Sequence, residues 1–324
     1  MSSSVRAAES VVSGTLDEIR AARDRHAART ASDVEDFIRL VERAYGREVD
    51  AFLERYRRDV VLRAVLDPLL EEAGAYLAWL GWVGWNAANL APLACPDLQA
   101  AAKSSAPAML AYCGLRLVDD GLDGHDTYKG HHPTLVAFFG SAPRKLGEGR
   151  RNAFSAFVGS CVFTFALERI AQVSGAAAAS TISTLFERAA IGVLAEVLVG
   201  DGADSATYQQ IVRRKAAAYN LILYRPFLDE VEPAARRTLT RVLSDLDVLA
   251  QLINDLNDVG DDRERPQLNA FHTLYQSTEA GAEISRRLDD LWTLASLVPS
   301  DFRDAVGAML INAGVEQRAE DSQL

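Results

Sequence analysis

The sequence has few cysteines and no long apolar run. Three of its 324 residues are cysteines, and they lie in apolar surroundings without paired spacing: Cys95, Cys113 and Cys161. This usage predicts reduced core thiols in a cytoplasmic protein, and no histidine is placed to activate a thiolate. No charged-then-apolar leader follows Met1, and no apolar run extends uninterrupted for 18 residues. We therefore expect neither secretion nor a membrane span.

Positive charge is also scarce. The chain has 34 Lys and Arg residues against 45 Asp and Glu residues, which gives a net charge of −11. Such a surface argues against non-specific binding of nucleic acid or of an anionic membrane. It does not argue against an anionic substrate that is held through metal ions.

The sequence also lacks a β-sheet pattern. No stretch alternates β-branched and polar residues with period 2, whereas nearly all of the chain from Val34 onward has helical periodicity. With 49% hydrophobic residues, the chain can bury a large core. We predict one all-α domain over residues 31–324, a helical bundle around a central active-site cavity, after a flexible or loosely helical segment over residues 1–30. Helices are expected near residues 34–57, 59–80, 98–124, 147–173, 178–199, 205–225, 232–260, 279–296 and 301–317.

What the chain does have is two acidic clusters, each of which ends an apolar helical stretch. The first is Asp119-Asp120-Gly121-Leu122-Asp123. At 3.6 residues per turn, Asp119 and Asp123 share one helix face, and Asp120 lies one turn from Asp123. Carboxylates beside an apolar surface are costly unless cations neutralise them. The cluster is either a metal site or a solvated helix terminus.

The second cluster is Asn254-Asp255-Leu256-Asn257-Asp258, which continues to Asp261 and Asp262. Asn254, Asp258 and Asp262 form one stripe along a helix. Oxygen ligands that leave room for water and phosphate suit Mg²⁺ better than Zn²⁺. Two such clusters together predict a pocket in which Mg²⁺ ions hold a diphosphate between two helices.

These motifs resemble those of the class I isoprenoid synthases, in particular the trans-polyprenyl diphosphate synthases and the related terpene synthases, over residues 60–317. DDGLD at 119–123 matches the family's DDxxD motif, and the following GHHPT parallels its G-x-P-T segment. QLINDLND at 251–258 matches Q-x-x-D-D-x-x-D, with Asn254 in place of the first Asp. Lys215 lies where the family has a diphosphate-binding lysine.

The resemblance implies a set of site residues. It implies that metal, as three Mg²⁺ ions, is held on one side of the pocket by Asp119, Asp120 and Asp123. On the other side the ligands would come from the second cluster: Asn254, Asp255, Asp258 and Asp262. Lys215 and Arg214 would bind the diphosphate together with Gln251. A solvated basic turn remains the alternative for Arg213-Arg214-Lys215, and His131 and His132 are interpreted as lid or surface residues.

The departures from the family pattern concern a second substrate. Chain-elongating members carry a Gly-Gly-Lys-x-x-Arg-Pro motif that holds isopentenyl diphosphate, but residues 80–86 here are LGWVGWN, without Lys or Arg. The family's histidine on the first acidic helix is absent, and Ala111 is near its place. The arginine pair after the motif is reduced to residues 126–129, DTYK. A second diphosphate would therefore meet apolar and aromatic surface, which is unfavourable for an anion.

Two further features concern the prenyl chain. Trp79, Trp82 and Trp85, flanked by Tyr76, recur at helical spacing; they are either core residues or, for Trp82 and Trp85, aromatic faces that contact a carbocation. In the resembled family, bulky aromatics four and five residues before DDxxD shorten the accepted chain. Here these positions are Leu115 and Gly114, which predicts an open cavity floor and a substrate of about C20 length.

We therefore expect a Mg²⁺-dependent class I terpene synthase that ionises a prenyl diphosphate and cyclises or deprotonates the cation. No buried side-chain base is evident, so the released diphosphate would take the final proton. The alternatives are a prenyl diphosphate synthase or prenyltransferase, and a non-catalytic regulatory subunit of such an enzyme. A calcium-binding module is weaker, because neither cluster has the D-x-D-x-D-G spacing. The resemblance also implies a homodimer.

Overall fold

Two compact units make up the structure. Unit 1 contains Met1–Val34, Asn89–Pro96 and Glu187–Leu324, and unit 2 contains Glu35–Ala88 and Asp97–Phe186. Each unit is discontinuous in sequence, and the predicted single domain over residues 31–324 stays a prediction. The computed structural model describes residues 3–58, 74, 85–124, 126–128, 132–141, 147–199, 204–262, 270 and 277–315.

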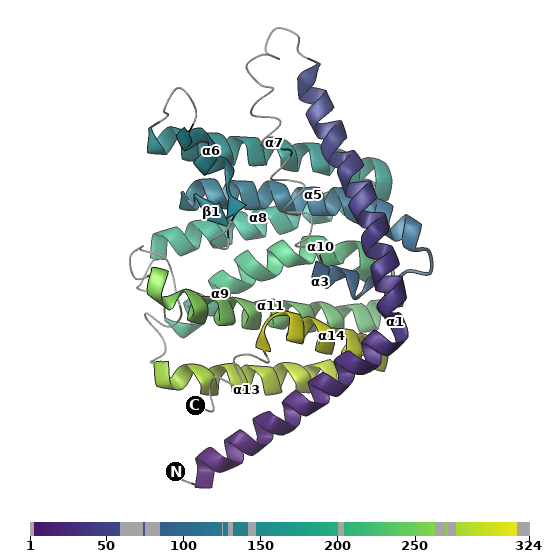
Figure 1. Ribbon diagram of the computed structural model, residues 1–324, viewed down its shortest axis with the longest axis vertical. Helices are drawn as coiled ribbons and strands as arrows, with labels where there is room; N and C mark the ends of the chain where they lie inside the picture. The colour runs from purple at the N-terminus through teal and green to yellow at the C-terminus, as the bar shows by residue number, and fades with distance from the viewer. Residues whose placement is uncertain are drawn as a thin grey trace. The chain divides into compact units, whose positions relative to one another are not determined.

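The fold is all-α, as predicted (Figure 1). The exception among the described residues is one antiparallel pair of two-residue strands, β1 (Thr127–Tyr128) and β2 (His132–Pro133). The long helices are α1 (Ser3–Arg57), α5 (Leu98–Asp123), α7 (Glu148–Ser174), α8 (Ala176–Val199), α11 (Pro233–Asp262), α13 (Ser277–Ala295) and α14 (Ser300–Asn312). The shorter ones are α3 (Trp85–Ala88), α4 (Ala91–Ala94), α6 (Leu135–Ser141), α9 (Ser205–Val212), a π-helical turn η3 (Arg213–Ala217) and α10 (Ala218–Leu228).

Two prolines lie inside helices. α5 begins at Leu98, where the Asp97 carboxylate accepts hydrogen bonds from the Gln99 and Ala100 amides at 2.9 and 3.1 Å. Pro107 is therefore inside α5, which runs from Leu98 to Asp123. Pro226 likewise lies inside α10, which continues to Leu228. The predicted helix over 59–80 lies outside the described residues, apart from residue 74.

Part of the N-terminal segment is packed, since the side chains of α1 are described from residue 14 onward. The flexible or loosely helical segment expected over residues 1–30 stays a prediction as a whole. Within unit 1, Leu16, Ile19 and Ala22 of α1 are buried. A Cβ on Gly307 of α14 would lie 2.9 Å from the Ala22 Cβ, so the two helices approach closely at this glycine. The sequence analysis did not predict this packed helix face, because the segment contains few large apolar side chains.

The same contact contains an ion-pair cluster around one buried carboxylate. Arg25 Nη2 and Arg29 Nη2 donate to the buried carboxylate of Asp304 at 2.8 and 2.6 Å. Burial alone would raise the pKa of Asp304, but the hydrogen bonds from both arginines hold this pKa below its ordinary value. Asp304 is therefore ionised, and its ion pairs with the two arginines anchor α1 to α14.

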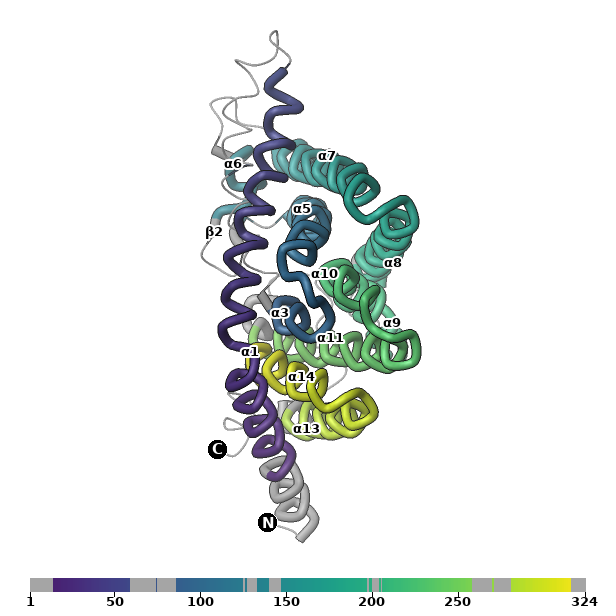
Figure 2. The backbone as a smooth tube through the Cα atoms, turned by 90° about the vertical axis from the view of Figure 1, so that its right-hand side faces the viewer, coloured from purple at the N-terminus to yellow at the C-terminus, as the bar shows by residue number. Residues whose placement is uncertain are grey.

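Helices α5 and α7 lie side by side in unit 2 (Figures 1 and 2). Glycines set their separation: a Cβ on Gly114 would lie 2.7 Å from the Phe163 amide nitrogen, and one on Gly159 would lie 2.5 Å from the Gly114 carbonyl oxygen. Any side chain there would collide with the backbone of the facing helix. The end of α5 that carries the first acidic cluster is thus held rigidly against α7.

The three thiols are free, as expected. Cys95 and Cys113 are buried, and burial raises the pKa of Cys95 to about 11 and that of Cys113 to about 12. Tyr45 OH donates to Cys113 Sγ at 3.2 Å. Thiols with such pKa values are unreactive near neutrality, which agrees with the interpretation of Cys95 and Cys113 as core residues, whereas Cys161 is only half-buried.

By length and composition, α7 is the one helix in the described part of the chain that could cross a membrane. In unit 2, however, it packs along α5, and its Val162, Phe163 and Phe165 side chains are buried. A core helix of a globular protein passes the same test, so α7 is weak evidence for a span.

Candidate functional site

Two carboxylates of the first acidic cluster share one cation from the same helix. Asp119 and Asp120 are buried, with side chains 3% and 0% exposed. Arg116 Nη1 donates to Asp119 Oδ2 at 2.6 Å, and Nη2 donates to Asp120 Oδ1 at 3.2 Å. The spacings i, i+3 and i, i+4 place the guanidinium beside both carboxylates. A protein cation thus stands beside two of the predicted metal ligands.

The end of the same cluster is more open. Asp123 is the last residue of α5 and is half-buried. It is followed by Gly124 at a φ of 69°, a left-handed conformation that ends the helix. Beyond it, the Asp126 carboxylate pairs with Arg151 of α7 at 3.1 Å. His131 lies outside the described residues, and the backbone of His132 belongs to β2.

Lys215 lies in the π-helical turn η3, between α9 and α10. Such turns, which contain one extra residue, occur frequently at functional sites. Lys215 Nζ donates to Glu196 Oε2 of α8 at 2.6 Å, and both side chains are 20% exposed. Gly192 makes this contact possible, because a Cβ there would lie 2.6 Å from the Lys215 amide nitrogen.

The second acidic cluster lies on α11, also in unit 1. Asp255 is buried, and its carboxylate accepts three hydrogen bonds from neutral donors. Gln251 Nε2 donates to Oδ1 at 2.7 Å, while Tyr208 OH and the Ala270 amide donate to Oδ2 at 2.6 and 3.0 Å. The neighbouring Asn254 side chain is exposed. Asp258 and Asp262 belong to α11, and their side chains lie outside the described part of the structure.

Lys215 and the buried part of the second acidic cluster line one small cleft. Its lining includes the polar side chains of Glu196, Tyr208, Lys215, Gln251 and Asp255. The predicted diphosphate-binding lysine is therefore placed beside the second acidic cluster, although the two are well separated in sequence. The cleft has a volume of about 10 Å³, which is room for roughly one water molecule. A diphosphate would fit only after one of these side chains moves.

Other predicted residues have different surroundings. Arg214 is exposed, and Arg213 pairs with Asp245 at 2.7 Å, so within the basic turn the cleft is lined by Lys215. Gly114 packs against the α7 backbone and cannot act as an open position of a cavity floor; its side of α5 is filled by Phe163 and Gly159. Leu115 is fully buried. Trp82 lies outside the described residues, as do Trp79 and Tyr76, and Trp85 begins α3 with its side chain not described.

Sequence reasoning missed four polar residues of this structure. Arg116, Glu196 and Tyr208 contact predicted site residues, and the signal for the first two was a charge within an apolar helical stretch. The fourth is Asp247 of α11, where Asn220 Nδ2 and Tyr224 OH donate to Oδ1 at 2.7 and 3.3 Å. Burial raises the pKa of Asp247 well above its ordinary value. A carboxyl with such a pKa holds its proton, and Asp247 does not line the cleft, so the expectation that the site has no buried side-chain base stays a prediction.

The donors present suit Mg²⁺ in chemistry, because carboxylate and amide oxygens are the ligands it prefers. Among the described residues, however, no group of three or more Asp, Glu, His or Cys side chains is arranged to hold a metal ion. Asp119 and Asp120 belong to unit 2 and Asn254 to unit 1. Their predicted use as ligands of shared metal ions stays a prediction.

Solved structures of prenyl diphosphate synthases have a similar fold. A decaprenyl diphosphate synthase from Rhodobacter capsulatus has a TM-score of 0.58 at 15% identity, covering 91% of this chain and 99% of that chain. A heptaprenyl diphosphate synthase from Staphylococcus aureus has a TM-score of 0.59 at 14% identity, over 89% and 98% of the two chains. A polyprenyl synthase from Caulobacter crescentus CB15, complexed with calcium and isoprenyl diphosphate, has a TM-score of 0.54 at 19% identity, over 91% and 98%.

No family model matches the sequence, and no curated protein matches it. At these identities, the structural similarity establishes the fold. The chain has the all-α fold of the polyprenyl diphosphate synthases, which confirms the resemblance noted in its motifs at the level of fold.

Proposed function

We propose that this chain is an enzyme acting on a prenyl diphosphate and that Lys215 binds the diphosphate group. One observation carries the proposal: Lys215, on a π-helical turn, lines the same cleft as Gln251 and Asp255 of the second acidic cluster. A π-helical turn at this point, held by a glycine contact, supports a functional role. The fold adds support, since its solved neighbours include a synthase complexed with isoprenyl diphosphate.

The reaction begins with heterolysis of the allylic carbon–oxygen bond. The electron pair leaves with the diphosphate, and an allylic cation remains. Lys215 would stabilise the growing negative charge by an ammonium already placed in the cleft. Its present partner, Glu196, is a carboxylate at 2.6 Å, so substrate binding exchanges one anionic partner for another. This exchange keeps the ammonium paired in both states.

Bound Mg²⁺ would neutralise further charge on the leaving diphosphate. The candidate ligands are Asp119, Asp120 and Asp123 on α5, together with Asn254, Asp258 and Asp262 on α11. We assign Asp255 a different role from the one expected, because three protein donors already occupy its carboxylate oxygens. It positions Gln251 and Tyr208 around Lys215.

The fate of the cation distinguishes two enzyme classes. Transfer to the double bond of a second molecule, followed by proton loss, is the prenyltransferase reaction, and the fold neighbours favour it over cyclisation. A terpene synthase is the second candidate, because residues 80–86 contain no Lys or Arg for a second diphosphate. In both cases a homodimer and a cytoplasmic location are parts of the proposal, whereas the expected C20 length loses its basis, because Gly114 packs against α7.

Product analysis tests the proposal. The purified protein is incubated with Mg²⁺ and C10, C15 or C20 prenyl diphosphates, with and without labelled isopentenyl diphosphate, and products are identified by mass spectrometry. Longer labelled diphosphates indicate a prenyltransferase, and hydrocarbons or alcohols formed without isopentenyl diphosphate indicate a terpene synthase. Absence of any product would overturn the enzymatic proposal in favour of a regulatory subunit.

A pair of variants tests the role of Lys215. Lys215→Ala should lower turnover at least about 100-fold, the scale for removing one preorganised charge-stabilising group. Arg213→Ala, on the same turn, removes an ion pair with Asp245 in which the Arg213 side chain is 48% exposed, and should leave turnover nearly unchanged. Equal losses in the two variants would contradict the assignment of Lys215.

A further inference from the structure

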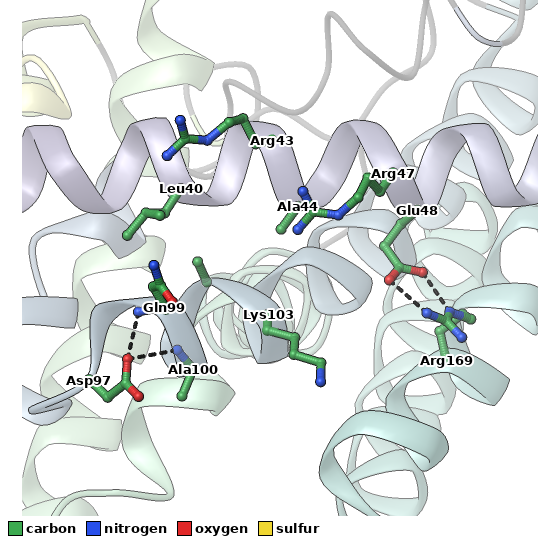
Figure 3. A pocket seen from close by; sticks show the side chains of 11 residues that line it. Leu40, Arg43, Ala44, Arg47, Glu48, Asp97, Gln99, Ala100, Lys103 and Arg169 are labelled. Atoms are coloured by element: carbon green, nitrogen blue, oxygen red, sulfur yellow. Dashed lines mark hydrogen bonds and ion pairs between the residues drawn. The ribbon is translucent and has the colours of Figure 1, made fainter.

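A large basic groove lies in unit 2, away from the acidic end of α5. Its volume is about 710 Å³, within the range of small-molecule sites. α1 lines it from Leu40 to Glu48, the start of α5 contributes Asp97 to Lys103, and α7 contributes Arg169 (Figure 3). Lys103 and Asp119 are 16 residues apart on α5, or about 24 Å along the helix. The basic groove is therefore separate from the first acidic cluster.

The two acids of the basic groove are already engaged. Arg169 Nε and Nη2 donate to Glu48 Oε2 and Oε1 at 2.7 and 3.0 Å, a two-point pair across the groove wall (Figure 3). Asp97 Oδ1 accepts from the first amides of α5 and caps that helix. The Arg169–Glu48 pair cancels one charge of each sign, whereas Asp97 keeps its charge but is engaged by backbone amides.

Three cations remain. Arg43 and Arg47 come from successive turns of α1, and Lys103 extends from α5 into the space below α1 (Figure 3). In the part of the chain that the structure describes, none of the three has an ion-pair partner. Elsewhere this acidic chain, with a net charge of −11, offers carboxylates in excess. Three like charges around one concavity repel one another unless an anion lies between them.

The floor of the basic groove is apolar and made of small side chains. Ala44 and Ala102 are buried at its base, and Leu40 and Ala100 line it further. Small side chains leave the volume open, whereas two arginines and a lysine provide charge-assisted donors suited to phosphate oxygens. The basic groove thus combines an anion-binding rim with an apolar floor.

We propose that the basic groove is a second anion site, which binds the phosphate or diphosphate group of a ligand whose apolar part lies on Leu40 and Ala44. The inference does not depend on the proposed function, since it uses none of the residues assigned to the reaction. The same chemistry is offered by a free phosphate ester and by the phosphate of a lipid headgroup. The experiment below separates these two sources.

The test compares two triple variants with the unmodified protein. Arg43→Gln/Arg47→Gln/Lys103→Gln removes the three cations of the groove. Arg39→Gln/Arg58→Gln/Arg150→Gln removes three exposed cations of the same unit that do not line it. Binding of inorganic pyrophosphate is measured by calorimetry in chelator, so that no metal-dependent site contributes, and binding to vesicles is measured by cosedimentation with phosphatidylglycerol or with phosphatidylcholine alone.

We expect the groove variant to lose at least tenfold in affinity for pyrophosphate, while the control variant changes less than twofold. Hydrogen exchange should slow over residues 40–48 and 97–103 when pyrophosphate binds. Binding only to phosphatidylglycerol vesicles, with the same loss in the groove variant, would identify a lipid headgroup as the source. Equal affinities in the two triple variants, or no binding to either probe, would overturn the proposal.

Discussion

The two acidic clusters follow similar apolar helices, yet their carboxylates are stabilised in different ways. On α5, Asp119 and Asp120 are balanced by Arg116, a cation from the same helix. On α11, the donors to Asp255 among the described residues are neutral and come from three segments, while Lys215 pairs with Glu196. The contacts of the α5 cluster form within one helix, whereas those of Asp255 on α11 form only when several elements pack together.

This difference predicts different weaknesses. A charge-balanced pair depends on its cation and should respond to other cations that compete for the same oxygens. A carboxylate held by neutral donors depends on hydrogen-bond geometry and should respond to any change that moves a neighbouring helix. The following four predictions separate the two kinds of stabilisation.

The largest effect is expected at Arg116. Arg116→Met leaves two buried carboxylates without their cation, and we expect the free energy of unfolding in chelator to fall by about 3 kcal/mol. Mg²⁺ should then raise the melting temperature of the variant more than that of the unmodified protein, because the ion replaces the lost charge. Thermal unfolding with and without Mg²⁺ checks both expectations.

The control for Arg116→Met is Arg55→Met in the same unit. Arg55 also makes two hydrogen bonds to carboxylate oxygens, those of Glu168, but this ion pair is exposed. Exposed pairs of this kind contribute at most about 1 kcal/mol. If Mg²⁺ stabilised both variants equally, Arg116 would not occupy the place of a metal cation.

A smaller loss is expected at Asp255. In Asp255→Asn, an amide NH₂ replaces one carboxylate oxygen and faces a protein donor, so the free energy of unfolding should fall by about 2 kcal/mol. Mg²⁺ should not restore it. Asp204→Asn serves as control, because Asp204 caps α9 through the Thr207 amide and Asn caps equally well. If Mg²⁺ restored the free energy of unfolding of Asp255→Asn, Asp255 would be a metal ligand after all.

Gly192 tests whether α8 holds Lys215 in place. In Gly192→Ala, the new Cβ would lie 2.6 Å from the Lys215 amide nitrogen, an overpacking cost of about 1–3 kcal/mol that is partly offset by the better helix propensity of Ala. We expect a net loss of about 1 kcal/mol by denaturant unfolding, with lowered turnover. Gly46→Ala, on α1 with nothing within 4 Å of its Cβ, should gain stability. A gain in both variants would refute the close contact.

The last effect is spread over a range of pH and concerns Asp247, which has no ion-pair partner among the described residues and does not line the cleft. Its raised folded pKa means that the native state keeps a proton that the unfolded state releases above pH of about 4. Stability should therefore fall as pH rises from about 4 towards the folded pKa, by at most about 1.4 kcal/mol per pH unit. Asp247→Asn should flatten this dependence in unfolding measured at several pH values, whereas Asp245→Asn should not.

Much of the fold was predictable because helix bounds follow local signals. The apolar periodicity predicts α5 to within one residue, and the predicted helix over 147–173 corresponds to α7 (Glu148–Ser174). The start of α1 was not predictable in the same way. Its packing depends on Gly307 and Asp304 of α14, which no local pattern near residues 16–29 reveals.

The site was predictable where its residues belong to a recognisable sequence motif. Lys215 and the second cluster lie together as the motifs indicated, but Glu196 and Tyr208 were missed, because each meets its partner through tertiary packing. Gly114 shows the opposite error. A missing side chain was interpreted as open space, whereas the facing helix fills it.

The discontinuity of the two units bears on the order in which the chain folds during synthesis. Unit 2 is complete once Phe186 has been made, so its core can form while the ribosome continues. The first turns of α1 must wait, because Arg29 finds Asp304 only 275 residues later. Until then Leu16, Ile19 and Ala22 have no partner from α14 to cover them. A nascent chain halted before residue 300 should therefore be a substrate for chaperones that bind apolar segments, and one released after residue 315 should not.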